Sequence, residues 1–134
     1  MVGGHAFSSH AYVRATKDID LWVDPEPANA ERLWRALAEF GAPLHAHGVT
    51  PDDFKKLGEV YQLGLPPSRV DLMTSMADIS FDDAWQQRVV VELGGIKDVS
   101  VIGIDHLIRA KEAANRLRDQ ADVADLKLAK ELRK

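Results

Sequence analysis

Two aspartates separated by one apolar residue, Asp18 and Asp20, could together bind a metal ion. Three apolar residues alternate with them and predict a strand with one buried face: Ile19, Leu21 and Val23. Side chains two residues apart on a strand point to the same side, so the two carboxylates and Trp22 share the other face. Carboxylate oxygens are ligands for hard cations such as Mg²⁺. Taken alone, the pair fits an acidic, half-exposed strand equally well.

A third carboxylate, Asp71, lies between Val70 and Leu72 in a second predicted strand. If the two strands are neighbours, Asp71 can join the first pair. Three convergent carboxylates repel one another strongly unless a cation lies between them. Three aspartates and substrate phosphates can hold two Mg²⁺ ions about 3.5–4 Å apart. The sequence therefore predicts a two-metal site, on the condition that the strands are adjacent.

A pair of glycines, Gly3 and Gly4, precedes a predicted short helix over residues 5–13. A tight turn that leads into a helix N-terminus exposes backbone N–H groups, which bind phosphate. Glycine is favoured where the backbone and a ligand approach closely. Neither the glycines nor the aspartates are specific alone. Their combination, in this order along the chain, favours a site for a phosphorylated substrate with metal.

Helices and strands alternate along the chain, which predicts an α/β or α+β domain with a mixed sheet. Beyond residue 13 the predicted elements are a strand over 18–24, a helix within 24–41, a short helix over 50–58, strands over 60–65 and 69–75, a short capped helix over 80–88, a hairpin over 89–102 around Gly94 and Gly95, and two helices within 104–134 that divide near Arg118 and Asp119.

Composition and length predict a single domain over residues 1–134 and exclude several functions. The chain has no cysteine, so a disulfide framework or a thiolate metal site is ruled out, as suits a reducing cytoplasm. No apolar run reaches the roughly 18–20 residues of a membrane span, and no signal-peptide pattern opens the chain. A net charge of −4 argues against broad nucleic-acid binding, which needs a basic surface.

The segment GGHA…RATKDIDLWV, with the later RVDLM, resembles the nucleotidyltransferase superfamily, and most of all its small prokaryotic members, including abortive-infection type toxins. The resemblance is sharpest over Val2–Val23. It implies a nucleotidyltransferase-like fold with a mixed, mainly antiparallel sheet, flanking helices and C-terminal helices. It implies transfer of a nucleoside monophosphate from a nucleoside triphosphate such as ATP to a hydroxyl acceptor, with Mg²⁺ or Mn²⁺.

Carried over by residue, the resemblance implies that Gly3 and Gly4 hold the nucleotide phosphates. Asp18, Asp20 and Asp71 would bind the metal, and Asp71 would also be the general base toward the acceptor hydroxyl. Three residues ahead of the carboxylates would contact the nucleotide: Arg14, Thr16 and Lys17. The alternative for these three is an ordinary loop and strand start.

The C-terminal helices also resemble those of the family, where a lysine, an arginine and an aspartate recur. Here these residues would be Lys111, Arg116, Asp119 and Asp122, with Lys111 reaching the triphosphate and Asp122 orienting a basic group. The alternative is a solvated helix face. It would lie opposite an apolar stripe of Leu107, Ala114, Leu117, Ala121, Ala124 and Leu128.

Such families usually have a helix and a complete strand ahead of the Gly-Gly turn. The sequence starts at Met1, so we expect a misassigned start or a truncation, which would leave a sheet edge uncovered. A homodimer could cover that edge. The acceptor stays open among RNA, a protein and a small alcohol. A second hypothesis is a regulatory or toxin–antitoxin partner protein with weak or lost catalysis on the same fold.

Overall fold

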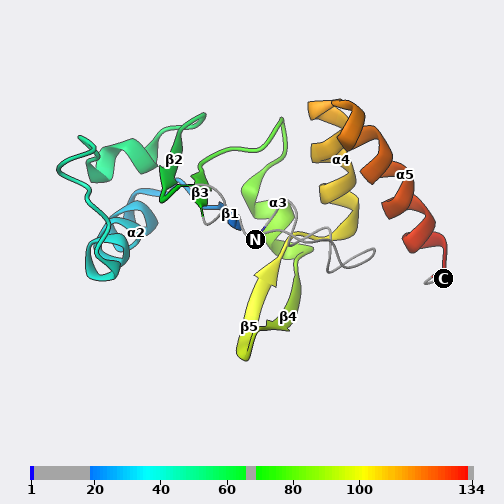
Figure 1. The fold of residues 1–134 in the computed structure, drawn as a ribbon, viewed down its shortest axis with the longest axis horizontal. Helices are drawn as coiled ribbons and strands as arrows, with labels where there is room; N and C mark the ends of the chain where they lie inside the picture. Colours follow the sequence, from blue (N-terminus) through cyan, green and yellow to red (C-terminus); the bar gives the residue numbers. More distant parts are fainter. Residues whose placement is uncertain (2–18, 66–68, 133–134) are drawn as a thin grey trace.

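The computed structural model describes residues 1, 19–65 and 69–132, and the predicted helix over 5–13 lies outside them. The fold is mixed α/β, with one parallel and two antiparallel strand pairings, as the sequence predicts at this level (Figure 1). No helix in the described ranges is both long and apolar enough to cross a membrane.

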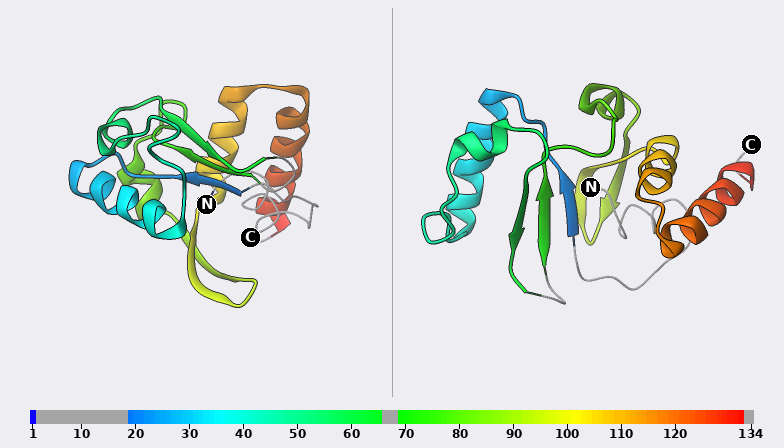
Figure 2. Two further views of the ribbon diagram at one scale, coloured as in Figure 1. Left: turned by 60° about the vertical axis from the view of Figure 1, so that its left-hand side comes forward. Right: turned by 90° about the horizontal axis from the view of Figure 1, so that it is seen from above.

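A three-stranded sheet lies near the centre of the molecule (Figure 2). It contains β1 (Ile19–Trp22), β2 (Val60–Leu63) and β3 (Val70–Met73), in the order β1-β3-β2. The first strand pairs with β3 in parallel, and β2 pairs with β3 antiparallel. Among the described residues β1 is therefore an edge strand, and the two segments that carry the predicted carboxylates are neighbours.

One face of this sheet packs against α2 (Pro27–Phe40) and the short 3₁₀ helix η1 (Pro51–Lys55). Local sequence signals set the ends of α2. The Glu26 carboxylate accepts hydrogen bonds of 3.0 Å from two backbone N–H groups of the first turn, and Gly41 ends the helix at a φ of 98°. The buried members of this core are Ala30, Leu37, Leu44, Phe54 and Leu72.

The predicted capped helix and hairpin follow as α3 (Phe81–Gln86), β4 (Val89–Leu93) and β5 (Ile96–Val101). The hairpin turns at two glycines with positive φ and extends away from the rest of the molecule (Figure 1). Two antiparallel helices, α4 (Ile104–Ala114) and α5 (Leu117–Leu132), complete the chain.

The two C-terminal helices separate at Asn115, a few residues before the predicted position. Asn115 has a φ of 51° and caps α4 in the left-handed conformation. Asparagine adopts this conformation more readily than most residues, because its short polar side chain hydrogen-bonds locally. The signal at the break was therefore an asparagine rather than the glycine or proline that commonly marks one.

A second core lies on the other side of the three-stranded sheet. Its buried members come from β5, the segment directly after it, α4 and α5: Val101, Ile102, Leu107, Ile108 and Leu126. Trp22 and Met73, which are register partners on β1 and β3, pack against it. The residues on either side of Trp22, Leu21 and Val23, pack into the first core, so the predicted alternation of faces along this strand is confirmed.

Gly103 lies where the chain leaves the hairpin and enters α4. A Cβ atom added there would lie 2.5 Å from the backbone oxygen of Gln87, a position that no side chain can take without moving the backbone. We expect Gly103→Ala to lower the free energy of unfolding by about 1–3 kcal/mol, the usual cost of overpacking. Urea denaturation measures the change.

Gly103→Ser separates the clash from helix capping, because Gly103 is also the N-cap residue of α4. Serine caps a helix better than alanine, but it carries the same Cβ atom. The clash requires both variants to be destabilised, with Gly103→Ser losing about 1 kcal/mol less than Gly103→Ala because serine caps the helix. A serine variant as stable as the unaltered protein would contradict the steric explanation.

Candidate functional site

Asp20 and Asp71 lie side by side on adjacent strands. They are register partners in the parallel β1–β3 pair, and Gln62 of β2 is the register partner of Asp71 on its other side. Register partners project to the same face, and neighbouring strands lie about 4.8 Å apart. The three side chains therefore form one polar row across the sheet, and both carboxylates belong to it.

Arg69 supplies a positive charge at this row. Its Nε lies 2.8 Å from Asp71 Oδ1, and its Nη2 donates to Asp71 Oδ2 at 3.1 Å. The Asp71 side chain is 13% exposed and that of Arg69 is 28% exposed, so the pair is only partly open to solvent. The Nη2 contact is a charge-assisted hydrogen bond, which is stronger than a neutral one, and the Nε contact is an ion pair.

Arg69 was not among the site residues predicted from the sequence. A signal was present, because Arg69 stands two residues before Asp71 in the predicted strand segment, and such residues share a face. The arginine partly balances the negative charge that two neighbouring carboxylates place on this face.

Most of the other predicted site residues lie outside the described residues: Gly3, Gly4, Arg14, Thr16, Lys17 and Asp18. Within the described ranges, no group of three or more histidine or carboxylate side chains is close enough to hold a metal ion. Asp20 and Asp71 account for two of the three predicted carboxylates. In the sequence, Asp18 immediately precedes the first residue of β1.

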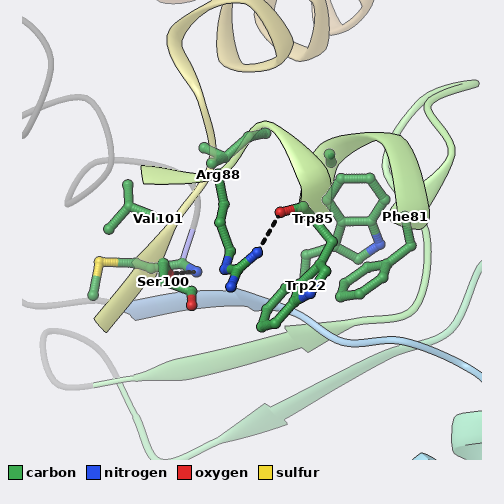
Figure 3. A pocket seen from close by; sticks show the side chains of 9 residues that line it. Trp22, Phe81, Trp85, Arg88, Ser100 and Val101 are labelled. Atoms are coloured by element: carbon green, nitrogen blue, oxygen red, sulfur yellow. Dashed lines mark hydrogen bonds between the residues drawn. The ribbon is translucent and has the colours of Figure 1, made fainter. Parts of the chain in front are cut away.

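A cleft of about 50 Å³ lies beside the polar row, between β1, α3 and the end of β5 (Figure 3). Trp22 lies two residues beyond Asp20 on the same face of β1, which is about 7 Å along the strand. The Met1 backbone hydrogen-bonds to Ser100 and Ile102 and closes one side. The lining residues are Met1, Trp22, Phe81, Ala84, Trp85, Arg88, Ser100, Val101 and Ile102.

The aromatic rings of the cleft pack mainly on one another. Trp22 meets Phe81 edge-on at 5.3 Å between centroids, and Phe81 stacks on Trp85 at 6.1 Å. The Arg88 guanidinium lies 3.8 Å from the centroid of the Trp85 ring and donates to the Trp85 carbonyl oxygen at 2.8 Å (Figure 3). These contacts engage Trp85 from Phe81 and from Arg88, while the residue as a whole remains 47% exposed.

Two N–H donors in the cleft wall are buried without an acceptor among the described residues: Trp22 Nε1 and Arg88 Nε. Buried donors are usually paired, because an unmade hydrogen bond costs the full desolvation of the group. With the Arg88 charge, these donors suit a molecule that carries oxygen acceptors. No sequence pattern indicated Arg88, because it is distant from Trp22 along the chain.

A buried ionic network joins α4 to α5. Lys111 Nζ lies 2.7 Å from Asp122 Oδ2 and 3.8 Å from Asp119 Oδ1, and Arg116 Nε donates to Asp119 Oδ2 at 2.7 Å. Asp119 is 2% exposed and Asp122 is 3% exposed. Asp122 therefore does hold a basic group, which is Lys111. Buried charges persist in a fold when they are paired and hydrogen-bonded in this way.

The network corrects the alternative interpretation of these helices. A solvated polar face is wrong for Asp119 and Asp122, because both are buried against α4. The apolar stripe is present on α5, but its expected burial is wrong, because Leu117 is 85% exposed and Leu128 is 60% exposed. A prediction from helical periodicity places charged residues on the solvent side. It contains no information that Lys111, on the neighbouring helix, pairs with the carboxylates of Asp119 and Asp122.

The acid stability of the protein should depend on Asp119. Burial raises the pKa of its carboxyl, but hydrogen bonds from Arg116 and the charges of Arg116 and Lys111 outweigh this and leave the pKa below its ordinary value of 3.8. A depressed carboxyl pKa contributes stability that is complete above the ordinary value and is lost as the pH falls through the lower, folded-state pKa. In urea denaturation from pH 5 to pH 2.5, Asp119→Asn should therefore lose stability less steeply than the unaltered protein below pH 4.

Glu26→Gln is the matched control for this measurement. The pKa of Glu26 is also lowered, by the two backbone hydrogen bonds at the start of α2, but that carboxylate is fully exposed. Glu26→Gln should therefore change the loss of stability below pH 4 less than Asp119→Asn does. An Asp119→Asn curve parallel to that of the unaltered protein down to pH 2.5 would refute the linkage.

No protein-family model matches the chain, and a search of curated proteins finds no match.

Proposed function

We propose that this chain is a nucleotidyltransferase-type protein that transfers a nucleoside monophosphate from a nucleoside triphosphate to a hydroxyl group. The observation that supports the proposal most is the placement of Asp71 directly beside Asp20, on adjacent strands and on one face. Two-metal phosphoryl transfer needs convergent carboxylates of this kind. Asp18, immediately before β1, would be the third.

In the proposed reaction, the acceptor oxygen forms a bond to the α-phosphorus of the triphosphate. The bond from this phosphorus to the bridging oxygen breaks, and pyrophosphate leaves. Asp71 takes the proton of the acceptor hydroxyl. Mg²⁺ or Mn²⁺, held by Asp18, Asp20 and Asp71, would neutralise the triphosphate and activate the attacking oxygen. No redox partner is required.

The remaining residues have supporting roles in this proposal. Gly3 and Gly4 would cradle the phosphates, with Arg14, Thr16 and Lys17 beside them. Lys111 would face the triphosphate from the C-terminal helices, oriented by Asp122, 2.7 Å away. The cleft at Trp22 and Arg88 is within reach of a group bound at Asp20 and would take oxygen atoms of the acceptor.

A partner-binding protein with weak or lost catalysis is the second candidate, and the ion pair of Arg69 with Asp71 favours it. An arginine that contacts both oxygens of a carboxylate competes with a metal for that ligand. The enzyme requires Asp71 to exchange Arg69 for metal when the triphosphate binds. The binding protein, as a regulator or a toxin–antitoxin partner, requires no such exchange.

Label transfer distinguishes the two candidates. The unaltered protein is incubated with Mg²⁺, each α-labelled nucleoside triphosphate in turn, and cellular RNA, cellular protein or a set of small alcohols. The enzyme predicts label in one acceptor class and release of pyrophosphate. Absence of transfer together with absence of triphosphate binding in calorimetry would overturn the enzyme and leave the binding protein.

A further inference from the structure

Helix α5 has an exposed apolar stripe opposite the face by which it packs. Leu126 is fully buried, whereas Leu117, nine residues earlier and so two and a half turns away, is 85% exposed. Leu128 is 60% exposed, and Ala121 and Ala124 between them are exposed as well. The four residues follow the spacing i, i+4, i+7 and i+11, which is that of a single helix face.

The stripe faces away from the rest of the molecule. Helix α5 lies on the outer side of α4 and forms the edge of the molecule, both in Figure 1 and in the view from above in Figure 2. Its packing face carries Asp119 and Asp122 into the contact with α4. A surface helix ordinarily turns its apolar stripe inward, so the opposite arrangement indicates a second contact on the outer side.

We propose that α5 pairs antiparallel with α5 of a second copy of this chain. Pairing centred between Asp122 and Val123 places Leu117 against Leu128 of the second copy, and Ala121 against Ala124 of the second copy. The two-fold axis repeats each contact, so one stripe supplies both sides of the interface. Large residues meet at the ends, and small residues at the centre let the two helix axes approach closely.

The charges beside the stripe fit the same arrangement. Arg118 and Asp125 are seven residues apart and lie on the same side of the stripe. Antiparallel pairing brings Arg118 close to Asp125 of the second copy, and the two-fold axis repeats this pair of opposite charges. Opposed helix dipoles also favour antiparallel over parallel pairing. The stripe therefore complements itself in side-chain size, charge and direction.

Sedimentation equilibrium across about 1–100 µM protein measures the association. We expect a concentration-dependent dimer, and we expect Leu117→Glu and Leu128→Glu each to weaken it at least about tenfold, because a buried charge replaces an apolar anchor. Leu57→Glu is the matched control. Leu57 is 73% exposed but lies far from α5 along the chain, so this variant should dimerise normally. A monomer throughout the range, or equal weakening by Leu57→Glu, would overturn the proposal.

Cysteine pairing tests the direction of the two helices, and the chain has no cysteine of its own to interfere. Leu117→Cys and Leu128→Cys are made separately and oxidised mildly, first alone and then as an equimolar mixture. Antiparallel pairing predicts disulfide dimers in the mixture and few in either variant alone. Dimers formed as readily by each variant alone would show parallel pairing and refute the proposed arrangement.

Discussion

Asp20→Asn and Asp71→Asn should each reduce label transfer by about 10²- to 10³-fold, the usual effect of removing one preorganised electrostatic group from an active site. Asparagine keeps the shape of aspartate, and both residues lie on a three-stranded sheet whose packing depends on the flanking apolar residues. The loss should therefore come with an unchanged circular dichroism spectrum. Label transfer at saturating Mg²⁺ and triphosphate measures the effect.

The control for this pair is Glu92→Gln, which removes an exposed carboxylate from the β4–β5 hairpin. It should leave transfer unchanged. Calorimetry with Mn²⁺ gives a second readout, because each Asp→Asn change should weaken metal binding even if the acceptor is unknown. Full transfer by Asp20→Asn would contradict the proposed metal site, and full transfer by Asp71→Asn alone would remove Asp71 from it.

Lys111→Met should lower the free energy of unfolding by about 3–5 kcal/mol, the usual cost of breaking a buried ion pair by removing one partner. The change removes the cation that lies 2.7 Å from Asp122 and 3.8 Å from Asp119, while both buried carboxylates stay. Methionine keeps most of the lysine stem, so the loss reports the charge rather than packing. Urea denaturation at pH 7 measures the difference.

Two further variants make this test specific. Lys111→Met combined with Asp122→Leu removes both charges and should recover much of the loss, because an apolar pair often replaces a buried ion pair at little cost. Lys127→Met removes an exposed lysine from α5 and should change stability by less than about 0.5 kcal/mol. Equal effects of Lys111→Met and Lys127→Met would show that the network contributes little.

The local part of the fold was readable from the sequence. Ser80 predicted the start of α3, and Ser80 Oγ accepts a hydrogen bond from the Asp83 N–H. Gly41 predicted the end of α2, and Gly94 with Gly95 predicted the turn of the β4–β5 hairpin. Each of these signals acts within a few residues, so one short stretch of sequence holds all the information.

Contacts between distant segments were predicted only conditionally or not at all. The adjacency of Asp20 and Asp71 depends on the order of strands in the sheet. The sequence does not determine this order, so the three-carboxylate site was predicted only on the condition that the two strands are neighbours. The burial of Asp119 and Asp122 depends on a lysine one helix earlier. The pairing of Arg69 with Asp71 could have been predicted, because residues two apart on a strand share a face. The errors at Arg69, Asp119 and Asp122 share one cause. A prediction from hydrophobic periodicity assumes that every charged residue is exposed to solvent.

The network between α4 and α5 also fixes how far one helix can slide along the other. Leu126 is fully buried in the apolar core, and a shift of α5 by one residue that brought Val123 to the position of Asp122 would bring Lys127 to the position of Leu126. The same shift would leave Lys111 opposite an apolar side chain in place of its carboxylate partner. The α4–α5 pair therefore has a single alignment, which is set by polar contacts as well as by apolar burial. One buried polar residue sets the alignment of a coiled coil in the same way.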